Sequence, residues 1–228
     1  MKRLIFMFCV VLGFLASASC EESADALLQK AKAGDSTAQA DLGKMYAIGS
    51  GGLQRDGQEA VKWFTKSAEQ GNAKGEYFLG VMYQLGRGGL TKDTPAAIKL
   101  YDLAAKQGNV DAQFALGQIY YSGRGVPKDP AMAAKYYQQA AAQNQPIAEQ
   151  RLAAMYETGE GVPRDYVTSM KWYMKLSDNF AYAQYKIGYF YENGFGVPKD
   201  RTQALNWYRK AASLGSGEAV AALKKLEN

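Results

Sequence analysis

Apolar residues recur at helical spacing along nearly the whole chain, in short segments that glycine-rich turns separate. The stretch 112–140 shows the pattern clearly. Leu116 and Ile119 lie on one face of a predicted helix, and Gly123 suits the left-handed residue that ends a helix. Asp129, followed by a proline, suits the start of a second helix, because its carboxylate can cap free backbone N–H groups. Each predicted helix has only about three turns and is unstable alone in water, so both need neighbours.

The same two-helix segment recurs through the chain in register. A glycine inside the first helix returns at Gly43, Gly80, Gly117 and Gly188, with Ala153 in the fourth copy. The second helices carry large side chains in two adjacent columns: Trp63, Leu100, Tyr136, Trp172 and Trp207, then Phe64, Tyr101, Tyr137, Tyr173 and Tyr208. A glycine in mid-helix is costly, and it is explained if another helix packs against the bare backbone. The sequence therefore predicts an all-α solenoid of five helix pairs, with the aromatic columns in its core.

The repeat boundaries follow from these columns, and we place five repeats at 36–71, 73–108, 110–144, 147–179 and 182–215. The helical segment 23–33 is rich in alanine and leucine and aligns with the second helices, so it is a predicted half-repeat cap. The segment 217–226 is a lone first helix in which Lys224 replaces the helix glycine, as expected of a cap with a solvated outer face. No long linker or low-complexity tract interrupts the chain, which predicts a single domain over 20–228.

These motifs resemble the Sel-1-like repeats, a family related to the tetratricopeptide repeat. The matching pattern is Ala-Gln-x-x-Leu-Gly-x-x-Tyr, then Gly-x-Gly-Val-Pro-x-Asp, then Ala-x-x-Trp-Tyr-x-x-Ala, and it fits closely from Ala183 to Ala211. The chain departs from the pattern at Gly75, Ala153 and Ser169. The resemblance implies a right-handed α/α superhelix whose concave face binds protein partners. It implies no enzymatic chemistry common to the family.

The first 19 residues are typical of a signal peptide. Two basic residues precede the apolar run 4–15, and small residues follow, with cleavage expected near Ala18 or Ser19. The run is too short for a comfortable membrane span. Cys20 leaves two interpretations open: it is the lipidated first residue of an outer-membrane lipoprotein, or the protein is free in the periplasm or secreted. In both cases we expect an exported bacterial protein, attached to a membrane only through a lipid on Cys20.

The sequence offers little catalytic chemistry. It contains no histidine, which removes Ser/His and Cys/His nucleophile systems and histidine metal sites. The aspartates at the turns are expected to cap the second helices: Asp56, Asp93, Asp129, Asp165 and Asp200. The 27 basic and 22 acidic residues are scattered, which disfavours nucleic-acid binding. We therefore predict that the protein is not an enzyme and uses no cofactor and no metal.

The remaining candidate is a surface stripe on the first helices, formed by residues just before the helix glycine, directly after it and five after it. Unlike the core columns, this stripe changes character from repeat to repeat, which is typical of a surface that recognises a protein or peptide. The alternative interpretations are sequence drift on a solvated face, or packing of Phe78 into the next repeat. The predicted partner-binding residues are an apolar anchor in the second repeat and polar residues further along: Phe78, Val81, Gln118, Arg151, Lys186 and Tyr189.

The resulting hypothesis is a non-enzymatic scaffold or adaptor of the bacterial cell envelope that binds a protein or peptide partner on its concave face. Stacked helices present side chains at fixed spacing, so little conformational entropy is lost on binding. Two alternatives stay open at this point. One is an envelope enzyme, or a glycan- or peptidoglycan-binding protein, that uses carboxylates and exposed tyrosines. The other is a secreted virulence factor that binds a host protein.

Overall fold

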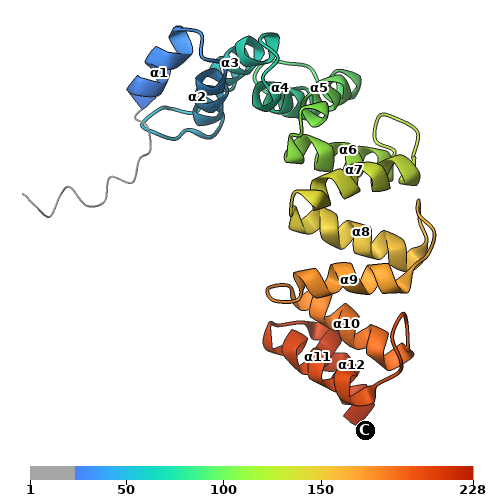
Figure 1. Ribbon diagram of the computed structural model, residues 1–228. Coiled ribbons are helices and arrows are strands. Elements are labelled where there is room, and N and C mark those ends of the chain that lie inside the picture. Colours follow the sequence, from blue (N-terminus) through green and yellow to red (C-terminus); the bar gives the residue numbers. More distant parts are fainter. Residues whose placement is uncertain (1–23, 228) are drawn as a thin grey trace, which may run out of the picture.

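The computed structural model describes residues 24–227, and these residues form twelve α-helices and no strand. Figure 1 shows the helices in chain order along a bent, elongated rod, with α1 at one end and α12 at the other. Their bounds are α1 (Ala24–Lys32), α2 (Ser36–Ile48), α3 (Gly57–Glu69), α4 (Ala73–Leu85), α5 (Thr94–Lys106), α6 (Val110–Ser122), α7 (Pro130–Ala142), α8 (Pro146–Thr158), α9 (Tyr166–Leu176), α10 (Ala181–Asn193), α11 (Arg201–Ser213) and α12 (Gly217–Glu227).

Five helix pairs make up the rod. The first helices of the pairs are α2, α4, α6, α8 and α10, and the second helices are α3, α5, α7, α9 and α11. Helices that follow one another in the chain pack together, and α1 and α12 cover the two ends. The predicted all-α superhelix of five helix pairs with half-repeat caps is therefore confirmed. Each first helix begins at, or one residue before, the start that the sequence predicts for its repeat.

Two local signals define each turn between a first and a second helix. Oδ1 of Asp129 accepts a hydrogen bond from the backbone N–H of Met132 at 2.9 Å and so caps α7. The other predicted caps do the same for their helices: Asp56, Asp93, Asp165 and Asp200. At the start of the turn, Gly123 has a φ of 69°, in the left-handed region that glycine adopts at little cost. The first helix therefore ends, and the second begins, at residues that the sequence specifies.

The helix glycines allow an aromatic ring from the second helix of the same repeat to lie directly on the first helix. A Cβ added to Gly117 would lie 2.6 Å from the ring of Tyr137, and one added to Gly80 would lie 2.8 Å from that of Tyr101. No side chain larger than hydrogen fits in such a contact without displacing the ring. The rings of this column are at most 1% exposed: Phe64, Tyr101, Tyr137, Tyr173 and Tyr208. This predicted core column is confirmed.

The neighbouring column is only partly in the core, which corrects the prediction for it. Trp63 is buried, while the other four residues of the column are half-buried: Leu100, Tyr136, Trp172 and Trp207. One residue along an α-helix turns the side chain by about 100°, so this column lies nearer to solvent than the rings beside it. Lysine side chains partly cover it, with Nζ of Lys210 4.2 Å from the centre of the Trp207 ring.

A buried polar ladder joins consecutive repeats. Its first-helix members lie four residues before the helix glycine or its alanine replacement and are 3–6% exposed: Gln39, Glu76, Gln113, Glu149 and Gln184. Nε2 of Gln39 donates to the carbonyl of Ala31 at the end of the preceding helix, and Gln113 donates in the same way to Ala105. Glutamines at the ends of the following second helices donate back to the ladder, from Gln70 to Gln39, Gln107 to Glu76 and Gln143 to Gln113. Hydrogen bonds thus connect these buried groups to the preceding helix, to the end of the second helix of their own repeat, or to both.

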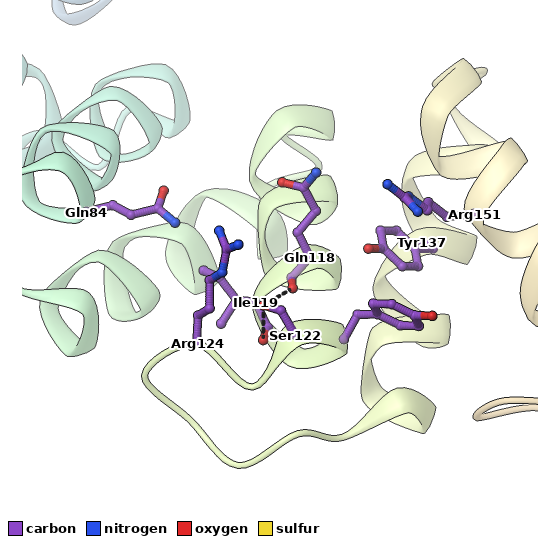
Figure 2. Close-up of a pocket in the computed structure, with 8 residues that line it drawn as sticks. Gln84, Gln118, Ile119, Ser122, Arg124, Tyr137 and Arg151 are labelled. Carbon is purple, nitrogen blue, oxygen red and sulfur yellow. Dashed lines mark hydrogen bonds between the residues drawn. The ribbon is translucent and has the colours of Figure 1, made fainter.

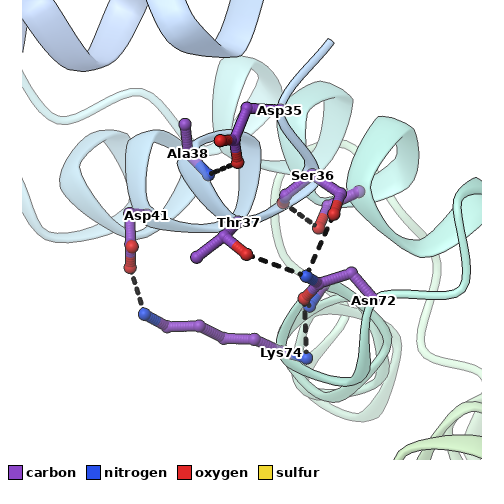
Figure 3. Close-up of polar contacts among 9 residues, drawn as sticks. Asp35, Ser36, Thr37, Ala38, Asp41, Asn72 and Lys74 are labelled. Atoms are coloured by element: carbon purple, nitrogen blue, oxygen red, sulfur yellow. Dashed lines mark hydrogen bonds and ion pairs between the residues drawn. The ribbon is translucent and has the colours of Figure 1, made fainter.

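Figure 3 shows a second set of polar contacts, at the junction of the first two repeats. Nδ2 of Asn72 donates to Oγ of Ser36 at 3.2 Å and to Oγ1 of Thr37 at 3.3 Å. Lys74, two residues further on, forms an ion pair with Asp41. Asn72 and Lys74, at the start of α4, therefore both bind side chains of α2.

The predicted signal peptide and Cys20 lie outside the described residues. Within residues 24–227, none of the helices combines the length and the apolar character that a bilayer span requires.

The polar ladder leads to a first prediction, for Glu76. Burial raises the pKa of its carboxyl, and the hydrogen bond from Gln107 opposes this only in part. We predict that Glu76→Gln raises the free energy of unfolding at pH 7 by about 1 kcal/mol. The amide carries no charge to desolvate, and its Nε2 can donate to the carbonyl of Ala68 as Gln39 donates to Ala31.

The increase in the free energy of unfolding that Glu76→Gln causes should depend on pH in a defined direction. The penalty for the buried glutamate begins as the pH rises above its unfolded-state pKa and is complete above its raised folded-state pKa. The advantage of Glu76→Gln should therefore be full at pH 7 and shrink toward pH 4, which denaturant titrations at the two pH values measure. Glu149→Gln is the matched control and should give no gain, because it removes the ion pair between Glu149 and Nζ of Lys175 at 2.6 Å. Equal gains in both variants, or a gain independent of pH, would contradict this account.

Candidate protein-binding surface

A cavity of about 230 Å³ opens on the side of the rod that the first helices line. We call it the inner-face cavity. Figure 2 shows side chains from α4, α6, α8 and the turn after α6 reaching toward one space. The lining residues are Gln84, Gln118, Ile119, Tyr121, Ser122, Arg124, Tyr137 and Arg151. A second cavity of about 60 Å³ shares Tyr121, Tyr137 and Arg151 with it, so the two form one depression between the third and fourth repeats.

Two arginines give the inner-face cavity a positive charge. Arg124 and Arg151 are exposed, and neither forms an ion pair within the described part of the chain. Glu160, which lines only the smaller cavity, is already engaged: it accepts from Nζ of Lys128 and from the hydroxyl of Tyr121, both at 2.8 Å. These two hydrogen bonds hold the pKa of Glu160 below its usual value. The charge of the two arginines is therefore left for a ligand.

Each buried ring and two further side chains form a set of three, and we call each set an inner-face triad. The first member is the ring residue of the second helix. The second lies four residues after the glycine position of the first helix, and the third lies two residues before the glycine position of the next first helix. The five triads, in chain order, are Phe64, Ala47 and Phe78; Tyr101, Gln84 and Ala115; Tyr137, Tyr121 and Arg151; Tyr173, Glu157 and Lys186; and Tyr208, Glu192 and Ala222.

Donors and acceptors are matched in four of the five triads. Where the ring is a tyrosine, its hydroxyl donates to the second member: Tyr101 to Gln84 at 2.8 Å, Tyr173 to Glu157 at 3.2 Å and Tyr208 to Glu192 at 2.6 Å. In the first triad the ring is a phenylalanine and the second member an alanine, so neither group is present. Phe78 stacks on Phe64 there, with ring centroids 5.1 Å apart. In each of these four triads, a ring hydroxyl, where there is one, therefore has its hydrogen-bond acceptor within the triad.

The third triad is not matched. Tyr121 stands at the acceptor position, but its hydroxyl donates to Glu160 instead. The hydroxyl of Tyr137 has no hydrogen-bond partner among the described residues, although the residue is only 1% exposed. Burial raises the pKa of Tyr137 to about 12, with the charge of Arg151 acting in the opposite direction. The hydroxyl is therefore protonated at neutral pH and can donate to a group in the cavity.

The structure brings two of the six predicted partner-binding residues together, since Gln118 and Arg151 both line the inner-face cavity. Phe78 and Val81 do not form a free apolar anchor. Phe78 packs on Phe64 and Tyr77, and Val81 packs against the core cluster that contains Tyr101. Both side chains are half-buried because they hold helices together, and Phe78 packs on the preceding repeat rather than on the next one, where the alternative interpretation placed it.

Lys186 and Tyr189 are also used within the chain. Nζ of Lys186 forms an ion pair with Glu157, and the two side chains are only 12% and 17% exposed. The same Nζ lies 4.9 Å from the centre of the Tyr189 ring. The accessible apolar residues of the stripe are instead Ile48 and Leu85, which are 62% and 51% exposed. The binding roles of the six residues stay predictions, and the geometry favours Gln118 and Arg151.

Sequence reasoning did not assign five residues of the cavity to a binding surface: Gln84, Ile119, Tyr121, Arg124 and Tyr137. A signal for three of them was present. The position four after the helix glycine is polar or aromatic wherever the second-helix ring is a tyrosine, and it is Ala47 where that ring is Phe64. Comparing this position with the ring position of the second helix, repeat by repeat, would have shown that the two residues are partners. Arg124, in the turn, carried no comparable signal.

The lining of the cavity has the chemistry to bind a polar group non-covalently. Its lining supplies amide, hydroxyl and guanidinium groups, all of which can donate hydrogen bonds. No group of three or more His, Cys, Asp or Glu side chains within residues 24–227 is placed to hold a metal ion.

The comparisons with known proteins agree with the repeat structure. The family model for the Sel1 repeat matches residues 36–72, 73–109, 110–145, 146–179 and 181–216, which coincide with the five helix pairs. A search among curated proteins found no match.

Two similar solved structures are of bacterial proteins. One is an Escherichia coli protein described as a protective antigen present in uropathogenic strains and displaying an SLR fold. It is 35% identical over 89% of this chain, with a TM-score of 0.83, and the alignment spans only 43% of the length of that protein. The other is a Sel1 repeat protein from Oxalobacter formigenes, 27% identical over 87% of each chain, with a TM-score of 0.75.

The triads generate a second prediction. Tyr208→Phe should lower the free energy of unfolding by about 1.5 kcal/mol, because Glu192 loses a charge-assisted hydrogen bond. Tyr137→Phe is the matched variant and should change it by less than about 0.5 kcal/mol, since its hydroxyl has no partner to lose. Urea denaturation of both variants beside the wild type measures the difference. Equal losses would mean that the hydroxyl of Tyr137 is bonded within the chain after all.

Proposed function

Because the chain belongs to the Sel1 repeat family, we propose that it is a non-enzymatic scaffold that binds a protein or peptide partner on the face lined by its first helices. Sel1 repeat proteins generally mediate protein–protein interactions, and the family is typically non-catalytic. The observation that carries the proposal is the inner-face cavity, where polar groups that the fold itself does not satisfy converge from three repeats.

A partner can contact several repeats along this face. Ser122, five residues after its helix glycine, lines the inner-face cavity, and Ile48 and Leu85 occupy the same position in the first two repeats. Both are exposed, so the face offers apolar contacts at one end and polar, positively charged contacts further along. Stacked helices hold these groups in place before binding, which keeps the entropy cost of association low.

The chemistry of the cavity supports a scaffold over an envelope enzyme. The pKa of Glu160, the carboxyl of the depression, is held below its usual value by Lys128 and Tyr121. A general acid needs the opposite shift, so that it stays protonated near neutral pH. The tyrosine rings that could stack on sugars are buried against helix backbones, which argues in the same way against glycan recognition by this column.

We further propose that the protein is exported and works in the cell envelope or outside the cell. The support is the basic start, the apolar run 4–15 and the small residues before Cys20. The description of the Escherichia coli relative as a protective antigen is consistent with this. A lipid on Cys20 would keep the protein at the outer membrane, whereas cleavage before Ser19 would leave it free.

Site-specific photocrosslinking in the producing organism tests the proposed face. A photoreactive amino acid at Leu85 or Gln118, on the first helices, should give discrete protein adducts. The same amino acid at Leu103 or Met174, which are exposed on second helices, should give none. Adducts are detected by gel shift and identified by mass spectrometry.

A pair of matched variants makes the outcome specific. Adding Ile48→Glu to the protein labelled at Gln118 should reduce the adduct at least about tenfold, because it buries a charge in an apolar contact. Adding Leu103→Glu, the same change on a second helix, should leave the adduct unchanged. Adducts that form mainly at Leu103 or Met174 would move the binding surface to the other side of the rod.

A further inference from the structure

The fourth inner-face triad shows which group is missing from the third. Glu157 accepts a hydrogen bond from the hydroxyl of Tyr173 and forms an ion pair with Lys186, which comes from the next first helix. Lys186 and Glu157 are almost enclosed, so a hydroxyl, a carboxylate and a cation form a closed set. In the third triad the hydroxyl of Tyr137 and the cation Arg151 occupy the corresponding positions, but no carboxylate lies between them.

Among the described residues, the carboxylates of Glu160 and Glu157 are already engaged elsewhere and do not complete this set. Glu160, the acid of the adjoining cavity, is bound to Lys128 and Tyr121. Glu157, on the same helix as Arg151, is held by Tyr173 and Lys186. Arg124 adds a second unpaired cation on the opposite side of the cavity (Figure 2). The cavity therefore combines two guanidinium groups with a hydroxyl that has no hydrogen-bond partner among the described residues.

We propose that the inner-face cavity is a subsite for a carboxylate of the partner, supplied by an aspartate or glutamate side chain. The inference rests on the proposed function, because it names the chemistry of the segment that the scaffold binds. The ligand carboxylate would accept from the hydroxyl of Tyr137 and pair with Arg151, as Glu157 does with Tyr173 and Lys186. The planar guanidinium group matches a carboxylate with two parallel hydrogen bonds.

The neighbouring repeats favour a carboxylate over other anions. Two of the five triads hold a glutamate at this position, Glu157 and Glu192, and in both the tyrosine hydroxyl donates to it. The space beside Tyr137 is thus shaped by the same backbone that accommodates a glutamate side chain elsewhere. A volume of about 230 Å³ has room for one such side chain.

The test measures binding of fluorescent twelve-residue peptide pools by anisotropy. All positions except one are randomised over uncharged residues, and the C-terminus is amidated. The fixed central residue is glutamate in one pool, glutamine in the second and phosphoserine in the third. A fourth pool has the central glutamine but a free C-terminal carboxylate, which distinguishes a carboxylate at a chain end from one on a side chain.

We expect the glutamate pool to bind at least about tenfold more tightly than the glutamine pool. Arg151→Gln should abolish this preference, and Tyr137→Phe should weaken it. Arg87→Gln is the matched control, because Arg87 occupies in the second repeat the turn position of Arg124 but does not line the cavity. This control should keep the full preference. Circular dichroism verifies that each variant is folded, as expected for exposed arginines.

Each other outcome has a defined meaning. A preference confined to the pool with the free C-terminus, and lost in Arg151→Gln, would keep the carboxylate subsite and assign it to a chain end. Equal binding of the glutamate and glutamine pools, tighter binding of phosphoserine alone, or no binding of any pool would overturn the carboxylate inference. None of these results would touch the proposed scaffold function, which the photocrosslinking experiment decides separately.

Discussion

The contact of an aromatic ring with a bare stretch of helix backbone is the constraint on which the rest of the structure depends. In four repeats a glycine inside the first helix leaves room for the ring of the second helix, and an added Cβ would lie only 2.6–2.8 Å from it. In the fourth repeat Ala153 takes the place of the glycine, and both it and Tyr173 are fully buried. Helices of this length are unstable alone, and this close packing within each repeat, continued between repeats, makes them a rod.

The same contact determines which polar groups the proposed binding face leaves without a partner in the chain. A ring fixed on the backbone also fixes its hydroxyl, which emerges beside the first helix and needs a partner. Most repeats supply that partner from within, as Glu157 does for Tyr173 and Glu192 for Tyr208. The third repeat does not, and there Tyr137 reaches a cavity with two unpaired arginines. Core packing and binding chemistry are therefore decided by one set of positions.

Much of the fold could be predicted from the sequence, because its determinants are local and repeat. Turn aspartates such as Asp129 and helix-ending glycines such as Gly123 act on their own helices, and the ring column repeats with the helix glycine. The site was less accessible. Whether Lys186 is free depends on Glu157 in the preceding repeat, and whether Phe78 is exposed depends on Phe64. Helical spacing assigns a residue to a face but does not show which side chain of the adjacent repeat covers it.

The most direct test of the account is the affinity of a Tyr121→Glu variant for the glutamate peptide pool. The substitution gives the third triad the carboxylate that Glu157 and Glu192 give to theirs. The chain's own carboxylate would then bind the hydroxyl of Tyr137 and the guanidinium of Arg151 and exclude the ligand. We expect the affinity to fall at least about tenfold, with no loss of folded structure. An unchanged affinity in a folded variant would contradict the account, because it would show that the unmatched triad is not what the partner binds.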